Sequence, residues 1–402
     1  MSDHSGAADP RQAGRMRRRA FLAAGGLGAA AAVAVPVGIW LSSGSTDEGA
    51  GSGPKDGKPA SDGPAGLELA PTATIEVGAT DLFPRITYSP DGKILAVALK
   101  TSVTLWDAAS RAEITTLAPK DAMFTQDLVF AGGLLALGYL KPPTLENRVA
   151  SDVGGIAVWD VATRKEVAAV TSPSEGLPLE GMSAVALSPD GRLVAGARNA
   201  GDGIGKVPVW DVRSGAHVKD LLVGAGEGTR LSSVRSVAFS PDGKMLAAGY
   251  GGGPKGGVIL FDTSTWSQIA TLPLDNAGAL GVIDLAFTPD GKTLVGAFGR
   301  IAVWDVASRK LTATLGTEDE HYQMAMSPDG SFIATSRGGP TPNGVITLRA
   351  LPSLKEITSV PAGPNGATHI TFHPDGHTLA TSASAPEAYS TVQLWNVKRR
   401  AT

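Results

Sequence analysis

A four-residue turn motif constrains this chain most, because it recurs along the sequence between two strand-like runs. The copy at residues 240–243 reads Ser-Pro-Asp-Gly. Proline at the second position presets φ for a tight turn, aspartate suits the third position, and glycine closes the turn. The flanking runs, 236–239 and 244–249, are apolar or alternate in polarity, as strands with one or two buried faces do. The motif predicts a β-hairpin wherever it occurs; further copies begin at Ser89, Ser188, Thr288, Ser327 and His373, with a weaker one at Ala131.

An aromatic residue followed by aspartate is the second repeated feature, and it ends the third predicted strand of each unit. After the turn at 240–243, the pair is Phe261-Asp262. Successive pairs are 43 to 53 residues apart, and a period of about 40 to 50 residues with four strands per unit is typical of a β-propeller blade. The chain is therefore predicted to be all-β, a seven-bladed propeller of four-stranded antiparallel blades; the other pairs are Trp106-Asp107, Trp159-Asp160, Trp210-Asp211, Trp304-Asp305 and the divergent Leu348-Arg349 and Trp395-Asn396.

The segments 236–249 and 301–310 closely resemble the repeats of bacterial WD-repeat (WD40) propellers, and the resemblance extends over residues 72–400. Members of that family often place a Gly-His pair before the first strand, and this chain lacks it. The side-chain network built on that histidine is therefore not expected here. The resemblance implies that the repeated Trp and Asp residues serve in packing and turns. Similar bacterial domains occur as outer parts of membrane-bound signalling proteins.

The last unit is expected to close the ring with a strand from the other end of the domain. Only three strands are predicted for it, the third ending at Trp395, and the chain stops where a fourth is due. Residues 72–77 resemble the fourth strand at 112–117. We therefore predict that residues 72–77 complete the seventh blade, which would leave no open sheet edge there.

Residues 1–41 are predicted to be an export signal or a membrane anchor. An uncharged, apolar run from 20 to 41 follows a cluster of arginines, as in export and insertion signals. The run is long enough to span a bilayer, so cleavage near Ala34 and retention as an anchor both stay open. Arginines before the run favour an N-terminus inside and a domain outside the membrane. A core resembling a twin-arginine signal is formed by Arg18, Arg19, Phe21 and Leu22; general secretion is the alternative.

Composition narrows the classes of function for the rest of the chain. Residues 42–66 are rich in Gly, Ser and Pro and are predicted to be a disordered linker, with the propeller at 67–402. The absence of cysteine excludes disulfides and thiol catalysis. Residues 1–41 hold five Arg and two Asp, so the net charge of −3 leaves −6 for residues 42–402. A weakly acidic domain without a basic stripe argues against nucleic acid as a partner.

The connections between second and third strands, and between blades, are long and individual, whereas the other turns are short and repetitive. In a propeller, the long connections share one face, here called the top face, and insertions in repeat proteins gather on a binding face. Glycine-rich filler is the alternative, because long surface loops cost little. Tyrosine and arginine suit protein contact, and the top-face candidates for partner contact are Arg198, Tyr250 and Arg337.

The first strands are mostly apolar, with polar residues at their starts, where a propeller places them at the mouth of its axial channel. These candidates could contact a ligand or line a water-filled channel. No metal is predicted at His369, His373 and His377, since they lie on a strand and its turn, and the acidic run 318–321 is interpreted as a solvated loop. The polar residues at the channel are Arg85, Arg235, Asp284, Gln323 and His369.

These features favour a non-enzymatic binding or scaffold propeller with a protein or peptide partner in the cell envelope, exported and tethered to the membrane. No catalytic residue, metal or cofactor is predicted, because the aspartates of the pairs recur in phase and no nucleophile elbow or phosphate-binding loop is present. The alternative is a propeller enzyme of the lactonase or hydrolase type, or a small-ligand binder, using the axial pocket. A structural envelope protein without a discrete ligand is a third possibility.

Overall fold

The computed structural model describes residues 66–78, 84–120, 122–141, 152–173, 182–198, 205–223, 233–251, 255–275, 281–316, 322–337, 344–363, 366–383 and 389–399. Arg18, Arg19, Phe21 and Leu22 of the predicted export signal lie outside these ranges, as do nearly all residues of the predicted linker. Within the described part of the chain, no helix is present that could cross a membrane.

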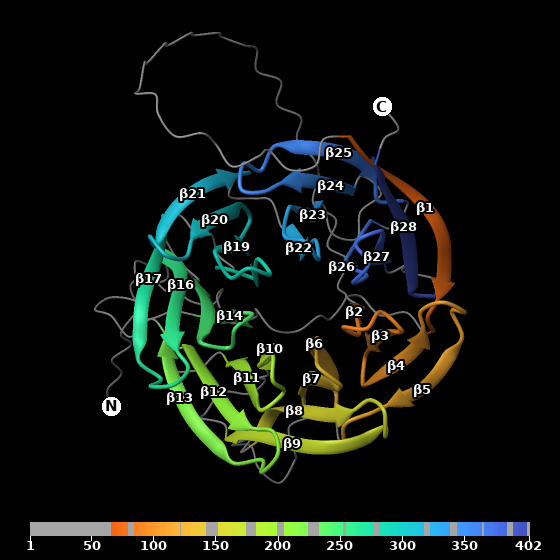
Figure 1. The fold of residues 1–402 in the computed structure, drawn as a ribbon. Coiled ribbons are helices and arrows are strands. Elements are labelled where there is room, and N and C mark those ends of the chain that lie inside the picture. The colour runs from red at the N-terminus through yellow and green to blue at the C-terminus, as the bar shows by residue number, and fades with distance from the viewer. Residues whose placement is uncertain are drawn as a thin grey trace, which may run out of the picture. The chain divides into compact units, whose positions relative to one another are not determined.

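Seven four-stranded antiparallel sheets surround a central axis, which confirms the predicted fold (Figure 1). The innermost strands are β2 (Arg85–Tyr88), β6 (Phe124–Ala131), β10 (Met182–Leu187), β14 (Ser233–Phe239), β18 (Asp284–Phe287), β22 (Tyr322–Met326) and β26 (His369–Phe372). The second strands are β3 (Ile94–Leu99), β7 (Leu134–Leu140), β11 (Leu193–Arg198), β15 (Met245–Gly251), β19 (Thr293–Ala297), β23 (Phe332–Arg337) and β27 (Thr378–Ala383).

The third strands carry the aromatic-Asp pairs, and the fourth strands form the outer rim. The third strands are β4 (Ser102–Asp107), β8 (Asp152–Asp160), β12 (Gly205–Asp211), β16 (Lys255–Asp262), β20 (Ile301–Asp305), β24 (Val345–Ala350) and β28 (Thr391–Arg399). The fourth strands are β5 (Glu113–Leu117), β9 (Lys165–Pro173), β13 (His217–Val223), β17 (Gln268–Asp275), β21 (Lys310–Leu315), β25 (Glu356–Pro361) and β1 (Leu67–Glu76). Blades 1 to 6 take their strands in chain order from β2, and blade 7 contains β26, β27, β28 and β1.

The N-terminal strand closes the ring, as predicted. β1 pairs with β28 in antiparallel register, with Ile75 opposite Val392. The pairing is longer than the sequence indicated, since it reaches Leu67 opposite Arg399. In the other blades the chain turns back after the aromatic-Asp pair, but here the two strands come from opposite ends of the domain. No hairpin limits their length, so the β1–β28 ribbon continues beyond the pair.

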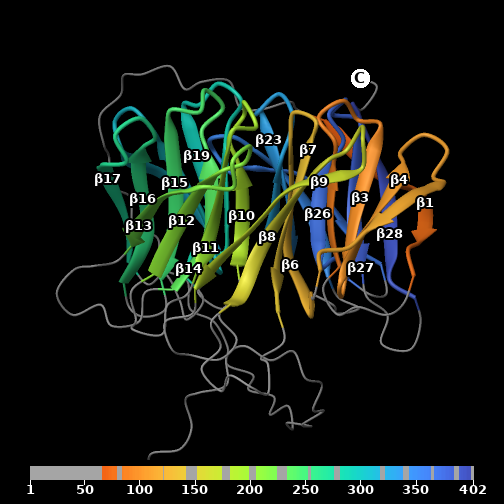
Figure 2. The ribbon, with the colours of Figure 1, turned by 90° about the horizontal axis from the view of Figure 1, so that it is seen from below.

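The Ser-Pro-Asp-Gly turns are built by the side chains that define them. The Ser240 hydroxyl donates to Asp242 Oδ1 over 2.7 Å and accepts the Met245 amide over 2.9 Å. Gly243 has φ of 70°, in the left-handed region where a side chain is disfavoured. These hydrogen bonds lower the pKa of the Asp242 carboxyl. Because six of the seven blades repeat such a turn, one face of the ring carries short, similar connections (Figure 2).

Replacing Asp242 with alanine is expected to lower the free energy of unfolding by about 1 kcal/mol, because the turn loses the acceptor for Ser240 and for the Lys244 amide. Chemical denaturation monitored by tryptophan fluorescence would measure the change. The matched control is Asp220→Ala on the outer strand β13, whose exposed carboxylate contacts the exposed His217 ring. An equal loss in both variants would contradict a specific role for the turn.

The aspartates of the repeated pairs cap the following turn, which supports a structural role. Asp107 Oδ1 accepts the Ser110 amide over 2.7 Å, and Asp262 Oδ1 accepts the Ser264 and Thr265 amides. The Ser264 hydroxyl also donates to Asp262 Oδ1 and, together with the amides, lowers the pKa of that carboxyl to about 2, while the Ser110 amide lowers the pKa of Asp107. The same arrangement recurs at Asp160, Asp211 and Asp305.

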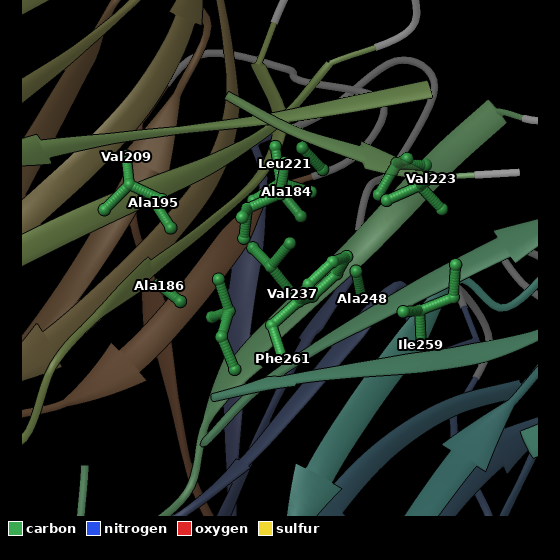
Figure 3. Packing of buried hydrophobic residues seen from close by; sticks show 14 residues of the cluster. Ala184, Ala186, Ala195, Val209, Leu221, Val223, Val237, Ala248, Ile259 and Phe261 are labelled. Carbon is green, nitrogen blue, oxygen red and sulfur yellow. The ribbon is translucent and has the colours of Figure 1, made fainter. Parts of the chain in front are cut away.

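The core consists of apolar layers between neighbouring blades. In the layer between blades 3 and 4, valines, alanines and Phe261 from both sheets interdigitate (Figure 3). Four of the repeated tryptophans are buried in such layers, which explains their recurrence. They are Trp159, Trp210, Trp304 and Trp395.

Blade 6 corrects one detail of the sequence analysis. The predicted pair there was Leu348-Arg349, but Arg349 pairs with Ile333 as Trp106 pairs with Leu95. The bulge in the following strand pairing also precedes Arg349, as it precedes Trp106. The divergent pair is therefore Arg349-Ala350. Blade 6 has neither the aromatic residue nor the aspartate of the pair, so the sequence alone left the position of the pair uncertain by one residue. Strand pairing fixes that position.

Candidate functional site

The five polar residues predicted at the channel all line one small pocket on the propeller axis. Its volume is about 60 Å³, and all seven innermost strands contribute to its lining, β10, β14 and β18 with more than one residue or a neighbour. Arg85, Arg235, Asp284, Gln323 and His369 therefore lie around a common space, although they come from five different blades. The pocket also contains Asp127 of blade 2 and Ser183 of blade 3, which the sequence analysis did not select.

Asp127 occupies the same strand position as Arg85 and Asp284. It pairs with Gly138 on its neighbouring strand, as Arg85 pairs with Ala98 and Asp284 with Ala297. Sequence reasoning missed it because the turn of blade 2 is the weak copy at 131–133, so the start of the strand was not aligned with the others. The apolar run after it, Leu128 to Phe130, was the signal that could have placed it.

Buried acceptors at this position join neighbouring blades. Asp127 Oδ2 accepts the amide of Val185 in blade 3 over 2.9 Å. Asp284 Oδ2 accepts the amide of Met324 in blade 6 over 3.2 Å. Innermost strands have no sheet partner on the axis side, so amides that point there need acceptors from elsewhere. These carboxylates provide them, which gives both a structural role.

Blades 7 and 1 are joined in the same way by histidine. His369 Nδ1 accepts the Ile86 amide over 3.4 Å. At the opposite end of the interface, His373 Nε2 lies 2.9 Å from the Gly92 carbonyl oxygen. Both histidines therefore bridge the blades where the ring closes. Among the residues that the structure describes, no three of His, Asp and Glu gather as they would around a metal ion; the acidic run 318–321 lies outside them.

The charges of the channel are strongly coupled. Burial and repulsion by Asp127 raise the pKa of Asp284 to about 6, and burial raises the pKa of Asp127 as well. Burial and the nearby Arg85 guanidinium lower the pKa of His369 to about 3, so this ring is neutral at pH 7. Arg85 Nη1 donates to Gln323 Oε1 over 3.3 Å across the mouth. Arg85 is thus the cation that the two carboxylates share.

Arg235 differs from every other charged group in the channel. Burial lowers the pKa of its guanidinium. Its Nε atom is buried and, within the described ranges, has no hydrogen-bond partner. A buried donor without an acceptor costs free energy. Arg235 is therefore the residue of this site best prepared to receive an acceptor from a ligand.

The three top-face candidates lie at different depths. Arg198, at the end of β11, is buried, Tyr250 on β15 is half-buried, and Arg337, at the end of β23, is exposed. Of the three, Arg337 offers the most surface to a partner. Part of each long connection, on which the binding-face hypothesis rests, lies outside the described residues.

A second, larger hollow lies on the face with the short turns. Its volume is about 830 Å³, and the turns at 327–329 and 374–377 form its walls with Leu67 and Val397. The extended β1–β28 ribbon supplies the latter two residues. The hollow is therefore a consequence of how the ring closes.

Comparison with known proteins agrees with this architecture. A family model described as WD domain, G-beta repeat, matches residues 225–259. Telomerase protein component 1 of Rattus norvegicus is 29% identical over 154 residues, which is 37% of this chain and 5% of that protein. The present chain thus spans a small part of the curated relative that it matches.

Two solved structures show the same fold. The β-propeller domain of Cps50 (Swd1) from Myceliophteria thermophila superposes with a TM-score of 0.64 at 14% identity, covering 82% of this chain and 100% of that one. A chain in the crystal structure of a mitotic checkpoint complex gives a TM-score of 0.61 at 18% identity, covering 82% and 95%. The family model matches one repeat-length segment of this chain, and the two solved structures show its β-propeller fold.

Proposed function

We propose that this chain is a non-enzymatic scaffold that holds a protein or peptide partner on its top face and at the mouth of its axial channel. The observation that carries the proposal is the difference between the two faces. The short turns share one hydrogen-bonded design on one face, whereas the sequence places long and dissimilar connections on the other. Variation on one face of a regular scaffold is typical of a binding surface.

The rigidity of the ring supports this function. Side chains clamp neighbouring blades at the channel through Asp127, Asp284 and His369, and β1 closes the ring by pairing with β28. A closed ring presents its loops from a fixed frame, so a partner does not have to order the frame when it binds. The propeller in the mitotic checkpoint complex shows that this fold occurs inside a protein assembly; that is an analogy of fold.

The size of the axial pocket favours a scaffold over a propeller enzyme. Pockets that hold a small organic substrate have volumes of about 300 to 1,000 Å³, whereas the channel pocket measures about 60 Å³. A space this small admits one functional group of a partner rather than a whole substrate. Several of the polar residues that line it, Asp127, Asp284 and His369, are also engaged in joining blades.

Export and tethering complete the proposal. The arginine cluster and the apolar run within residues 1–41 support export, with Arg18 and Arg19 as the twin arginines, and the linker at 42–66 would hold the propeller away from the membrane surface. The partner would then be a component of the cell envelope. Replacing Arg18 and Arg19 with lysine is expected to retain the protein inside the cell, as measured by fractionation; unchanged export would contradict the twin-arginine route.

Capture of the partner tests the scaffold function. The full chain, immobilised and exposed to native envelope extract, is expected to retain a partner that mass spectrometry identifies and that binds again when purified. A variant with the connections 198–206, 249–257 and 336–344 shortened is expected to lose it. Circular dichroism and thermal melting would verify that this variant folds.

A matched variant distinguishes the top face from the outer rim. The exposed apolar residues Val167, Val218 and Leu311 lie on outer strands, and replacing them with serine is expected to leave capture unchanged. Retention of the partner by the loop variant and its loss from the rim variant would overturn the proposal.

A further inference from the structure

At three of the seven blade interfaces, an amide of the innermost strand donates to a side chain of the preceding blade. The amide of Val185 in blade 3, of Met324 in blade 6 and of Ile86 in blade 1 each donates to a side chain of the preceding blade. The acceptors, Asp127, Asp284 and His369, occupy one equivalent position on the innermost strands. Two of the three are carboxylates.

The interface between blades 3 and 4 lacks this acceptor. Here the equivalent amide belongs to Val237, which pairs with Ala248 as Ile86 pairs with Val97. The equivalent acceptor position in blade 3 is Ala184, opposite Ala197. A methyl group cannot accept a hydrogen bond. Ala184 and Val237 belong to the same interblade cluster (Figure 3), and both line the channel pocket.

The unpartnered guanidinium of Arg235 lies in the same sector. It begins the same strand as Val237 and lines the same pocket as Ala184. Among the described residues its buried Nε has no acceptor. Two kinds of donor therefore meet where blade 3 supplies the Ala184 methyl group and the Ser183 hydroxyl, which already donates to the carbonyl oxygens of Ala197 and Val234.

We propose that this sector of the channel binds a carboxylate, which accepts hydrogen bonds from the Val237 amide and the Arg235 guanidinium. The ligand would take the place that Asp127 and Asp284 fill within the chain at other interfaces. The carboxylate comes either from a free carboxylic acid or from an acidic side chain or C-terminus of the partner; the second source rests on the proposed scaffold function.

The size and charge of the pocket fit one such group. Its volume of about 60 Å³ equals the share of roughly two water molecules in the liquid, at about 30 Å³ each. A carboxylate with its adjoining carbon is of this size, whereas a ring is larger. Arg85 is already shared by Asp127 and Asp284, so Arg235 is the cation that remains to balance an added negative charge. Charge-assisted hydrogen bonds are stronger than neutral ones.

Amide NMR of the full chain provides a direct test. Titration with acetate, and separately with a capped Gly-Gly-Asp-Gly-Gly peptide, is expected to shift the Val237 amide resonance with saturation. The peptide with Asn in place of Asp is expected to have no such effect. Acetate has few atoms, so its dissociation constant should be on the order of millimolar.

Two variants test the site, one by removing its charged donor and the other by supplying an acceptor from within the chain. Arg235→Gln removes the charged donor and is expected to weaken acetate binding by at least about tenfold. Ala184→Asp supplies the missing carboxylate from within, so the Val237 resonance should lie downfield before any ligand is added, and acetate should no longer shift it. Lys219→Gln removes one positive charge on outer strand β13 and is expected to bind acetate as the unmodified chain does.

Each outcome bears on the proposal. No saturable shift with either carboxylate, or an equal response in the Lys219 and Arg235 variants, would overturn it and leave water as the occupant. A response to acetate but not to the peptide would identify a free carboxylic acid as the source. The scaffold function is tested separately. A partner captured equally by the unmodified chain and by Arg235→Gln would uphold the scaffold function and refute binding of the partner through a carboxylate in the channel. Saturable acetate binding without any captured partner would uphold the carboxylate site and refute the scaffold function.

Discussion

Replacing Ile75 with aspartate is expected to lower the free energy of unfolding by at least about 4 kcal/mol, because the closing strand would carry a charge into an apolar layer. Ile75 is buried on β1, in the cluster that includes Ile86 and Leu95 of blade 1 and Val392 of β28. The variant loses the burial of a large aliphatic side chain and gains a carboxylate without a partner. The closing strand thus contributes both hydrogen bonds and core, and its loss would leave blade 7 with an open edge.

Thermal and urea unfolding of the full chain would measure this effect. The control is Thr74→Asp, one residue earlier, where the side chain is exposed and touches Gln393. Because neighbouring strand residues point to opposite faces, this variant introduces the same charge with an expected loss of less than about 1 kcal/mol. Similar losses in both variants would show that strand pairing alone, rather than the buried layer, closes the ring.

Replacing Asp284 with asparagine is expected to stabilise the protein at pH 7.5 by about 1 to 3 kcal/mol. The pKa of Asp284 is raised to about 6 from 3.8, and each unit of such a shift corresponds to about 1.4 kcal/mol. Between these two values the folded chain holds a proton that the unfolded chain has released. The carboxyl therefore favours folding least above pH 6, and this cost disappears as the pH falls below about 4. Asparagine avoids the cost and can still accept the Met324 amide.

Unfolding free energies measured from pH 4 to pH 8 would test this expectation. The gain of Asp284→Asn over the unmodified chain should be largest above pH 6 and vanish near pH 4. Asp242→Asn is the matched control, because hydrogen bonds lower the pKa of its carboxyl. Its effect should have the opposite sign: a loss of stability at neutral pH that diminishes as the pH falls. Destabilisation by Asp284→Asn at pH 7.5 would mean that Arg85 stabilises the charged form more than burial opposes it.

The sequence by itself determined the number of blades, the closing strand and five of the polar residues at the channel. Turn chemistry and strand alternation act between neighbours in the chain, so Ser240 to Gly243 specify their hairpin without help from the rest of the fold. Repetition in phase then converts a local signal into a global one, because seven similar units can bury their faces only by stacking around an axis.

The tertiary structure alone decided which groups meet. His369 accepts the amide of Ile86 from 283 residues away, and Arg85 contacts Gln323 across 238 residues; no local pattern encodes such pairs. The register of blade 6 and the membership of Asp127 in the site were settled by strand pairing, where the local signals were weak. The position of Arg235 beside Ala184, without an acceptor for its Nε among the described residues, is likewise a property of the closed ring.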